Sequence, residues 1–67
     1  MLPVNEINLF FHVLNLSENN NIYLNLHQIQ LLANEAFETY HAQIKTQASQ
    51  DEAVSIMEES LLNTLHL

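Results

Sequence analysis

Residues 25–47 read NLHQIQLLANEAFETYHAQIKTQ, and this stretch decides the fold. Its apolar residues recur at three- and four-residue spacing, which is the pattern of one face of a helix. Asn25 and Gln28 have the spacing of a capping box, so we predict a long helix over about residues 25–47. The apolar stripe of this helix consists of Ile29, Leu32, Ala33, Ala36, Phe37, Tyr40 and Ile44.

The C-terminal part of the chain predicts another helix, over about residues 50–65. Ser49 and Glu52 form a second capping box, and a short break at 46–49 turns this helix back antiparallel to the long one. Its inner stripe consists of Val54, Met57, Leu61 and Leu65, with Leu62 beside them.

The N-terminal segment predicts a short helix over about residues 4–16. Ile7, Phe10, Phe11 and Leu14 have the spacing of a helix face, and the asparagine-rich residues 17–21 predict the turn that follows. A strand in this segment, paired with residues 22–24 in a hairpin, is the alternative. We therefore expect an all-α chain, a small three-helix bundle in one domain over residues 1–67, completed by homodimerisation.

The first predicted helix is also apolar on its opposite side. Leu9, Val13 and Leu16 follow the same spacing there, and Leu31 likewise points away from the main stripe of the long helix. We predict that these four residues form a two-fold homodimer interface, because two-fold dimers are the commonest oligomers. The alternative is a monomer in which the first helix lies deep between the other two.

The charge of the chain restricts its partners. One basic residue, Lys45, stands against eight Asp and Glu, which gives a formal net charge of -7. Direct binding to nucleic acid or to an anionic membrane depends on Lys and Arg, so we expect neither. A basic protein, by contrast, would be attracted over some distance.

The residue types that are missing exclude several kinds of site. The chain has no cysteine and no glycine, so disulfides, thiolate metal sites, glycine-rich phosphate loops and glycine-built oxyanion loops are absent. No apolar run approaches the roughly 18 to 20 residues that span a bilayer, and residues 1–6 lack the basic start of a secretory signal. We expect a cytoplasmic protein that is not an enzyme and holds no cofactor.

One weak metal candidate remains. Glu38 and His41 have the Glu-x-x-His spacing that lets a carboxylate and an imidazole on one helix face the same ion. Sites of that kind use the motif on two helices, and this chain has one copy, on the polar side of its helix. We therefore expect no metal.

Two functions follow from these features. We expect a small regulator or adaptor that binds another protein through apolar anchors set in an acidic rim. The alternative is an inhibitor, of the type encoded by phages and mobile elements, whose acidic surface imitates nucleic acid and occupies a basic groove. A structural subunit of a larger assembly is a lesser alternative. The acidic surface consists of Glu35, Glu38, Asp51, Glu52 and Glu59.

Overall fold

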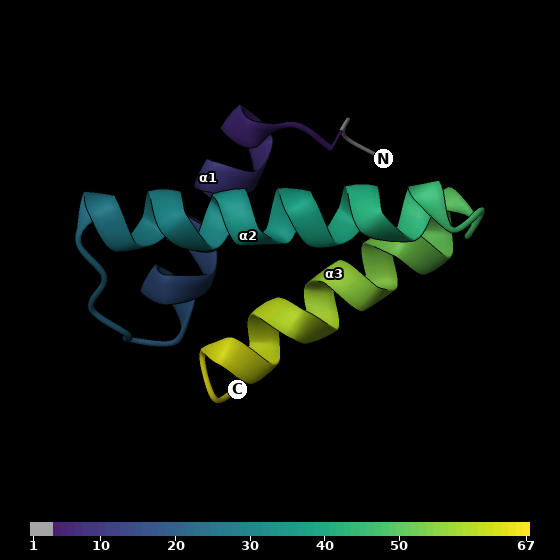
Figure 1. The fold of residues 1–67 in the computed structure, drawn as a ribbon. Helices are drawn as coiled ribbons and strands as arrows, with labels where there is room; N and C mark the ends of the chain where they lie inside the picture. Colours follow the sequence, from purple (N-terminus) through teal and green to yellow (C-terminus); the bar gives the residue numbers. More distant parts are fainter. Residues whose placement is uncertain (1–3) are drawn as a thin grey trace. The chain divides into compact units, whose positions relative to one another are not determined.

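The computed structural model describes residues 4–67, which form three α-helices and no strand (Figure 1). The helices are α1 (Glu6–Asn19), α2 (Leu26–Lys45) and α3 (Gln50–Thr64). The prediction of an all-α chain with three helices is confirmed.

The alternative of a hairpin over residues 9–14 and 22–24 is wrong, because residues 9–14 lie inside α1. Residues 1–3, to which the prediction of no secretory signal in part refers, lie outside the described residues.

The chain divides into two units, and the boundary between Glu35 and Ala36 falls inside α2. In the first unit α1 packs against the first part of α2. In the second unit α3 packs against the last part of α2. The single domain over residues 1–67 and the homodimer stay predictions.

Side-chain caps determine where the helices begin. Asn25 and Gln28 form the predicted capping box: the Gln28 N–H donates to Asn25 Oδ1 at 2.8 Å, and the Asn25 N–H donates to Gln28 Oε1 at 3.0 Å. Ser49 Oγ likewise accepts from the N–H of Glu52 at 3.2 Å. An additional cap at Asn5, which accepts from Asn8 at 2.8 Å, starts α1 at Glu6, two residues later than predicted.

All three helices end in the same motif, although the chain has no glycine. Asn21, Gln47 and His66 each adopt a positive φ, of 55°, 66° and 61° respectively. Each is followed by a residue whose N–H donates back to a carbonyl five residues earlier, as in a Schellman motif. The N–H of Ile22 donates to the Ser17 carbonyl at 2.9 Å, that of Ala48 to the Gln43 carbonyl at 3.1 Å, and that of Leu67 to the Leu62 carbonyl at 2.8 Å.

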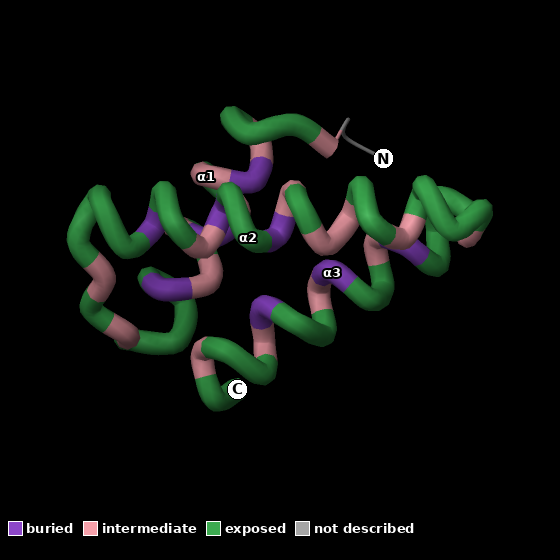
Figure 2. The backbone as a smooth tube through the Cα atoms, viewed as in Figure 1, coloured by how far each residue is buried: buried purple, intermediate pink, exposed green. Residues whose placement is uncertain are grey.

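The buried stripe of α1 consists of Leu9, Val13 and Ser17, which recur every fourth residue (Figure 2). Their side chains are 4%, 0% and 4% exposed. On α2, Ile29 and Ala33 are the buried residues of the first unit. Small residues such as Ala33 allow two packed helices to approach closely.

The faces predicted for α1 are therefore wrong. Leu9 and Val13, predicted to form an exposed dimer interface, are buried, whereas Ile7 and Phe11, predicted for the core, are 69% and 56% exposed. Ser17 continues the Leu9 stripe for another turn and is buried with it. Its hydroxyl donates to the carbonyl of Leu14 at 2.8 Å, so a polar residue can be buried at little cost.

The same residue explains why α1 is longer than predicted. Ser17 was assigned to the turn, but it is helical, and α1 continues to Asn19 instead of ending near residue 16. The turn itself is confirmed at the asparagines, where Asn21 has the left-handed conformation. Of the other predicted interface residues, Leu16 is half-buried and Leu31 is 48% exposed.

In the second unit the chain reverses direction at residues 46–49, and α3 runs back beside the last part of α2 (Figure 1). Met57 and Leu61 of the predicted inner stripe are buried, together with Ala53 and Ala36. Val54, Leu62 and Leu65 are half-buried, and Ile56 is exposed. The helical spacing thus identified the inner face of α3 correctly.

Candidate functional site

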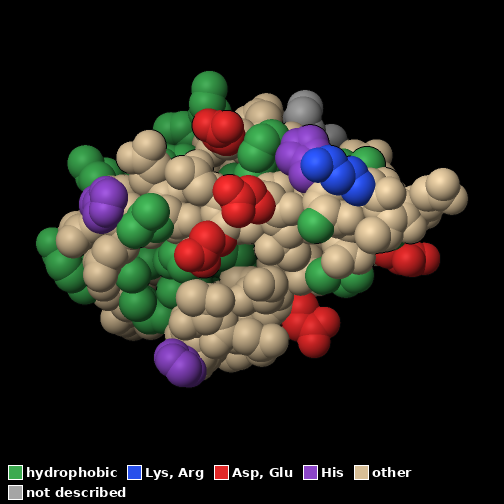
Figure 3. All heavy atoms as spheres, viewed as in Figure 1, with side chains coloured by type: hydrophobic (Ala, Val, Ile, Leu, Met, Phe, Trp, Pro, Cys, Tyr) green, Lys and Arg blue, Asp and Glu red, His purple; other side chains and the backbone are tan. Residues whose placement is uncertain are grey.

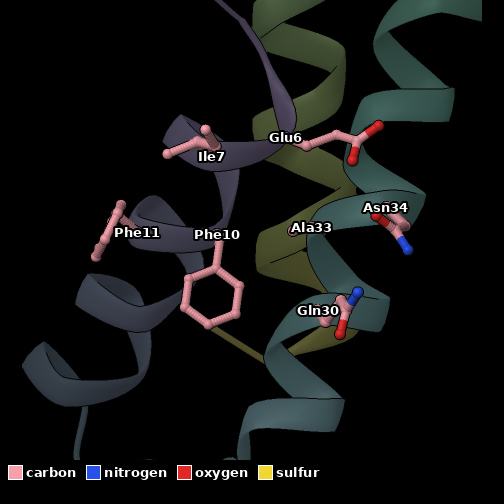
Figure 4. A pocket seen from close by; sticks show the side chains of 7 residues that line it. All are labelled: Glu6, Ile7, Phe10, Phe11, Gln30, Ala33 and Asn34. Carbon is pink, nitrogen blue, oxygen red and sulfur yellow. The ribbon is translucent and has the colours of Figure 1, made fainter.

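A groove of about 370 Å³ lies in the first unit, between α1 and α2 (Figure 4). We call it the α1 groove. Four of its seven lining residues are apolar, two are amides, and one is a carboxylate. The lining residues are Glu6, Ile7, Phe10, Phe11, Gln30, Ala33 and Asn34.

Aromatic side chains make up one wall of the α1 groove. The Phe10 ring extends into the space between the two helices, while Ile7 and Phe11 lie on the outer side of α1 (Figure 4). The rings of Phe10 and Phe11 meet edge to face, with 5.8 Å between their centres and an angle of 84°. This is a favourable geometry for two aromatic rings, so the wall is held in shape while much of its surface faces solvent.

The opposite wall belongs to α2. Gln30 and Asn34 are neighbours on one side of that helix and are exposed, and Ala33 lies between the two walls (Figure 4). Amide side chains both donate and accept hydrogen bonds. The α1 groove therefore offers an apolar wall and an adaptable polar margin.

Glu6 is the one charged residue among the described residues that line the α1 groove. It is the first residue of α1, it is exposed, and its side chain extends toward α2 (Figure 4). The first 35 residues of the sequence contain Glu6, Glu18 and Glu35 but no Lys or Arg. The charge in and around the groove is therefore negative.

Further apolar side chains of the same unit are exposed. Tyr23 and Leu26 are exposed near the start of α2, and Leu31 lies one helical turn before Asn34 of the groove margin. Leu31 was predicted to contribute to an interface because it points away from the main stripe, and its exposure agrees with that direction. Single exposed apolar residues are common, but their combination with an apolar groove in one small unit is less so.

The five residues of the predicted acidic surface are all exposed. Glu35 belongs to the first unit and the others to the second, so the structure does not define one continuous patch. On α3, Glu52 and Glu59 lie four residues before and three residues after the exposed Ile56, which places all three on one helix face. Acidic and apolar side chains accordingly both reach the surface in the space-filling view (Figure 3).

The weak metal candidates Glu38 and His41 are both exposed. The His41 ring makes edge contacts with Phe37, at 4.3 Å between ring centres and 88°, and with Tyr40, at 5.6 Å and 75°. Within residues 4–67 no three His, Asp, Glu or Cys side chains gather where they could hold an ion. The structure thus places His41 among aromatic rings.

Sequence reasoning missed the α1 groove, because it assigned Ile7, Phe10 and Phe11 to the core. No clear signal in the sequence could have revealed it, because the Ile7 and Leu9 stripes of α1 are of similar apolar quality. Of the helices formed by residues 4–67, none combines the length and apolar character needed to cross a membrane. No protein-family model, no curated protein and no solved structure matches this chain.

Proposed function

We propose that this chain acts by binding another protein, and that the α1 groove is its main contact surface. The exposure of Ile7 and Phe11, next to a groove with apolar lining, supports this proposal. Fully burying a side chain of that size contributes roughly 1.5 to 3 kcal/mol, and covering the exposed part of Ile7 or Phe11 contributes a fraction of that. Aliphatic and aromatic anchors of this kind carry much of the affinity in protein interfaces, while charges around them influence encounter rate and partner choice.

This proposal names the anchor residues. The sequence led us to expect apolar anchors without naming them, and Leu9, Val13 and Leu16 were predicted for a homodimer interface, of which Leu9 and Val13 are buried in the folded chain. Ile7 and Phe11 are the exposed apolar residues of α1 that serve as anchors, with Leu31 as a neighbour on α2. The function class expected from the sequence, a small regulator or adaptor without catalysis, is unchanged.

The test compares proteins retained from a lysate of the source cells by three immobilised forms of the chain. These are the wild type, the groove variant Ile7→Ser/Phe11→Ser, and the control variant Ile56→Ser, which changes an exposed apolar residue of the second unit. We expect a partner that is retained by the wild type and the control and lost from the groove variant. Retention of the same proteins by all three forms would contradict the proposal.

A nucleic-acid-mimicking inhibitor is the second candidate, favoured by the exposure of all five acidic residues of the predicted surface. Its partner would be a basic nucleic-acid-binding protein. Binding of that kind should weaken steeply as salt is raised and should compete with DNA or RNA. The variant Glu38→Gln/Glu59→Gln tests it without altering the capped first turn of α3, which contains Asp51 and Glu52. Binding that tolerates salt and this variant would exclude the inhibitor.

Self-association remains a separate proposal. Since Leu9 and Val13 are buried, a homodimer would have to use exposed residues such as Leu31 and Phe11. Two chains of net charge -7 also repel each other. Light scattering after size exclusion, at two protein and two salt concentrations, measures the mass directly. A mass of one chain under all four conditions would rule out the dimer.

A further inference from the structure

Resting on the proposed function, we infer that the α1 groove receives an amphipathic helix of a partner protein. The apolar face of that helix lies against Phe10 and Phe11, and Lys or Arg residues beside this face lie near Glu6. The shape, the lining and the charge of the first unit each support one part of this description.

The shape of the site favours a helix. The α1 groove lies between two helices, and the side-chain ridges of a third helix fit such a groove as they fit between neighbouring helices of a bundle. Adding a strand to a sheet edge is the other common way to bind a segment, and residues 4–67 contain no strand to extend. A volume of about 370 Å³ lies at the lower end of the range for ligand sites, which suits a few anchor side chains.

The lining favours apolar anchors at helical spacing. Ile7 and Phe11 are one turn apart on the outer side of α1, so they form an apolar stripe along that rim of the groove (Figure 4). A matching stripe on the partner helix has apolar residues at positions i and i+4, or i and i+3. Gln30 and Asn34, also one turn apart, bound the other side and can bond polar residues at the edge of that stripe.

The charge favours a basic partner over a second copy of this chain. Glu6 is the charged group of the groove, and residues 1–35 hold no Lys or Arg that could neutralise it. A Lys or Arg beside the apolar stripe of the partner would therefore be attracted to the Glu6 carboxylate. A second copy would bring another net charge of -7 to the same place.

The experiment is a selection from a displayed library of helical peptides, randomised at seven consecutive positions, on the order of two helical turns. The wild-type chain is the target, and the groove variant Ile7→Ser/Phe11→Ser removes sequences that bind elsewhere. We expect enrichment of apolar residues at helical spacing together with Lys or Arg. A synthetic peptide of the enriched sequence should bind at least about tenfold more weakly to Phe11→Ser, since loss of a central anchor residue in an interface exceeds that factor.

The variant Glu6→Lys tests the charge separately. It should weaken the basic peptide by several-fold and strengthen the same peptide with Glu in place of its Lys residues, while Ile56→Ser leaves both unchanged. Far-UV circular dichroism confirms that each variant keeps its helix content. The effect should shrink at high salt, because exposed charges are screened.

Each contrary outcome has a distinct meaning. If no sequence is enriched on the wild type relative to the groove variant, the proposed protein-binding function fails together with this inference. If apolar sequences are enriched without Lys or Arg, or proline-rich sequences prevail, the function stands and the basic helical partner is wrong. If the chain is a dimer that Phe11→Ser dissociates, the groove is occupied by a second copy and the inference is overturned.

Discussion

The Val13 side chain is completely buried, whereas that of Phe11, two residues earlier on the same helix, is 56% exposed. Both are strongly apolar, so hydrophobicity alone does not assign one of them to the core. The difference places the buried side of α1 on the Leu9 stripe and leaves the Phe11 side at the surface. Stability and the proposed binding should therefore respond to different substitutions on one helix.

Leu9→Ala should lower the free energy of unfolding by about 2 to 5 kcal/mol, because it removes buried methyl groups and leaves a cavity. Phe11→Ala, at the exposed position, should change it by only about 1 kcal/mol or less. Urea unfolding, followed by the circular dichroism signal of the helices, measures the free energy of unfolding of both variants. Equal losses for the two variants would mean that Phe11 is as much a core residue as Leu9.

Ser17→Asp should destabilise the chain by roughly 3 kcal/mol or more, since it buries a carboxylate next to the core. Ser17→Ala should stay within about 1 kcal/mol of the wild type, because the hydroxyl bonds only to a carbonyl of its own helix. Asn15→Asp is the control: it adds the same charge to an exposed position of α1. Thermal unfolding of the three variants compares them. A harmless Ser17→Asp would place Ser17 at the surface, as expected of a turn residue.

Gln47→Gly should raise the free energy of unfolding by up to about 1 kcal/mol. Gln47 has a φ of 66°, in the left-handed region. This conformation costs a residue other than glycine roughly 1 to 2 kcal/mol, and it costs glycine much less. The gain is partly offset, because glycine also makes the unfolded chain more flexible. Thr46→Gly is the matched control and should destabilise, because Thr46 has no positive φ and its hydroxyl bonds to the Gln43 carbonyl at 2.8 Å. Melting temperatures that move in the same direction for both variants would refute this account.

Asn25→Ala should lower the free energy of unfolding by about 1 kcal/mol, within a usual range of 0.5 to 2 kcal/mol for N-caps. The substitution leaves the N–H of Gln28 without its 2.8 Å acceptor. Asn15→Ala, at an exposed position inside α1, should instead stabilise slightly, because alanine has the higher helix propensity. Chemical unfolding of the two variants should therefore show opposite shifts of the midpoint.

Local structure was predictable where the interacting groups are close in sequence. The capping box of Asn25 and Gln28 joins residues three apart, and the cap at Ser49 does the same. The stripe of α3 was correct for Met57 and Leu61, which are buried, and it left out the buried Ala53. The first helix was ambiguous, since Ile7 and Leu9 begin two apolar stripes of similar quality on opposite sides.

The amino-acid sequence by itself determined the helices, their caps, the asparagine turn and the negative charge, since these depend on neighbouring residues and on composition. Only the tertiary structure decided which side of α1 is buried. The choice depends on how closely α1 approaches α2, and on whether a polar residue such as Ser17 finds a partner once it is covered. The α1 groove, and with it the proposed function, follows from that choice, because burying Leu9 and Val13 leaves Ile7 and Phe11 at the surface.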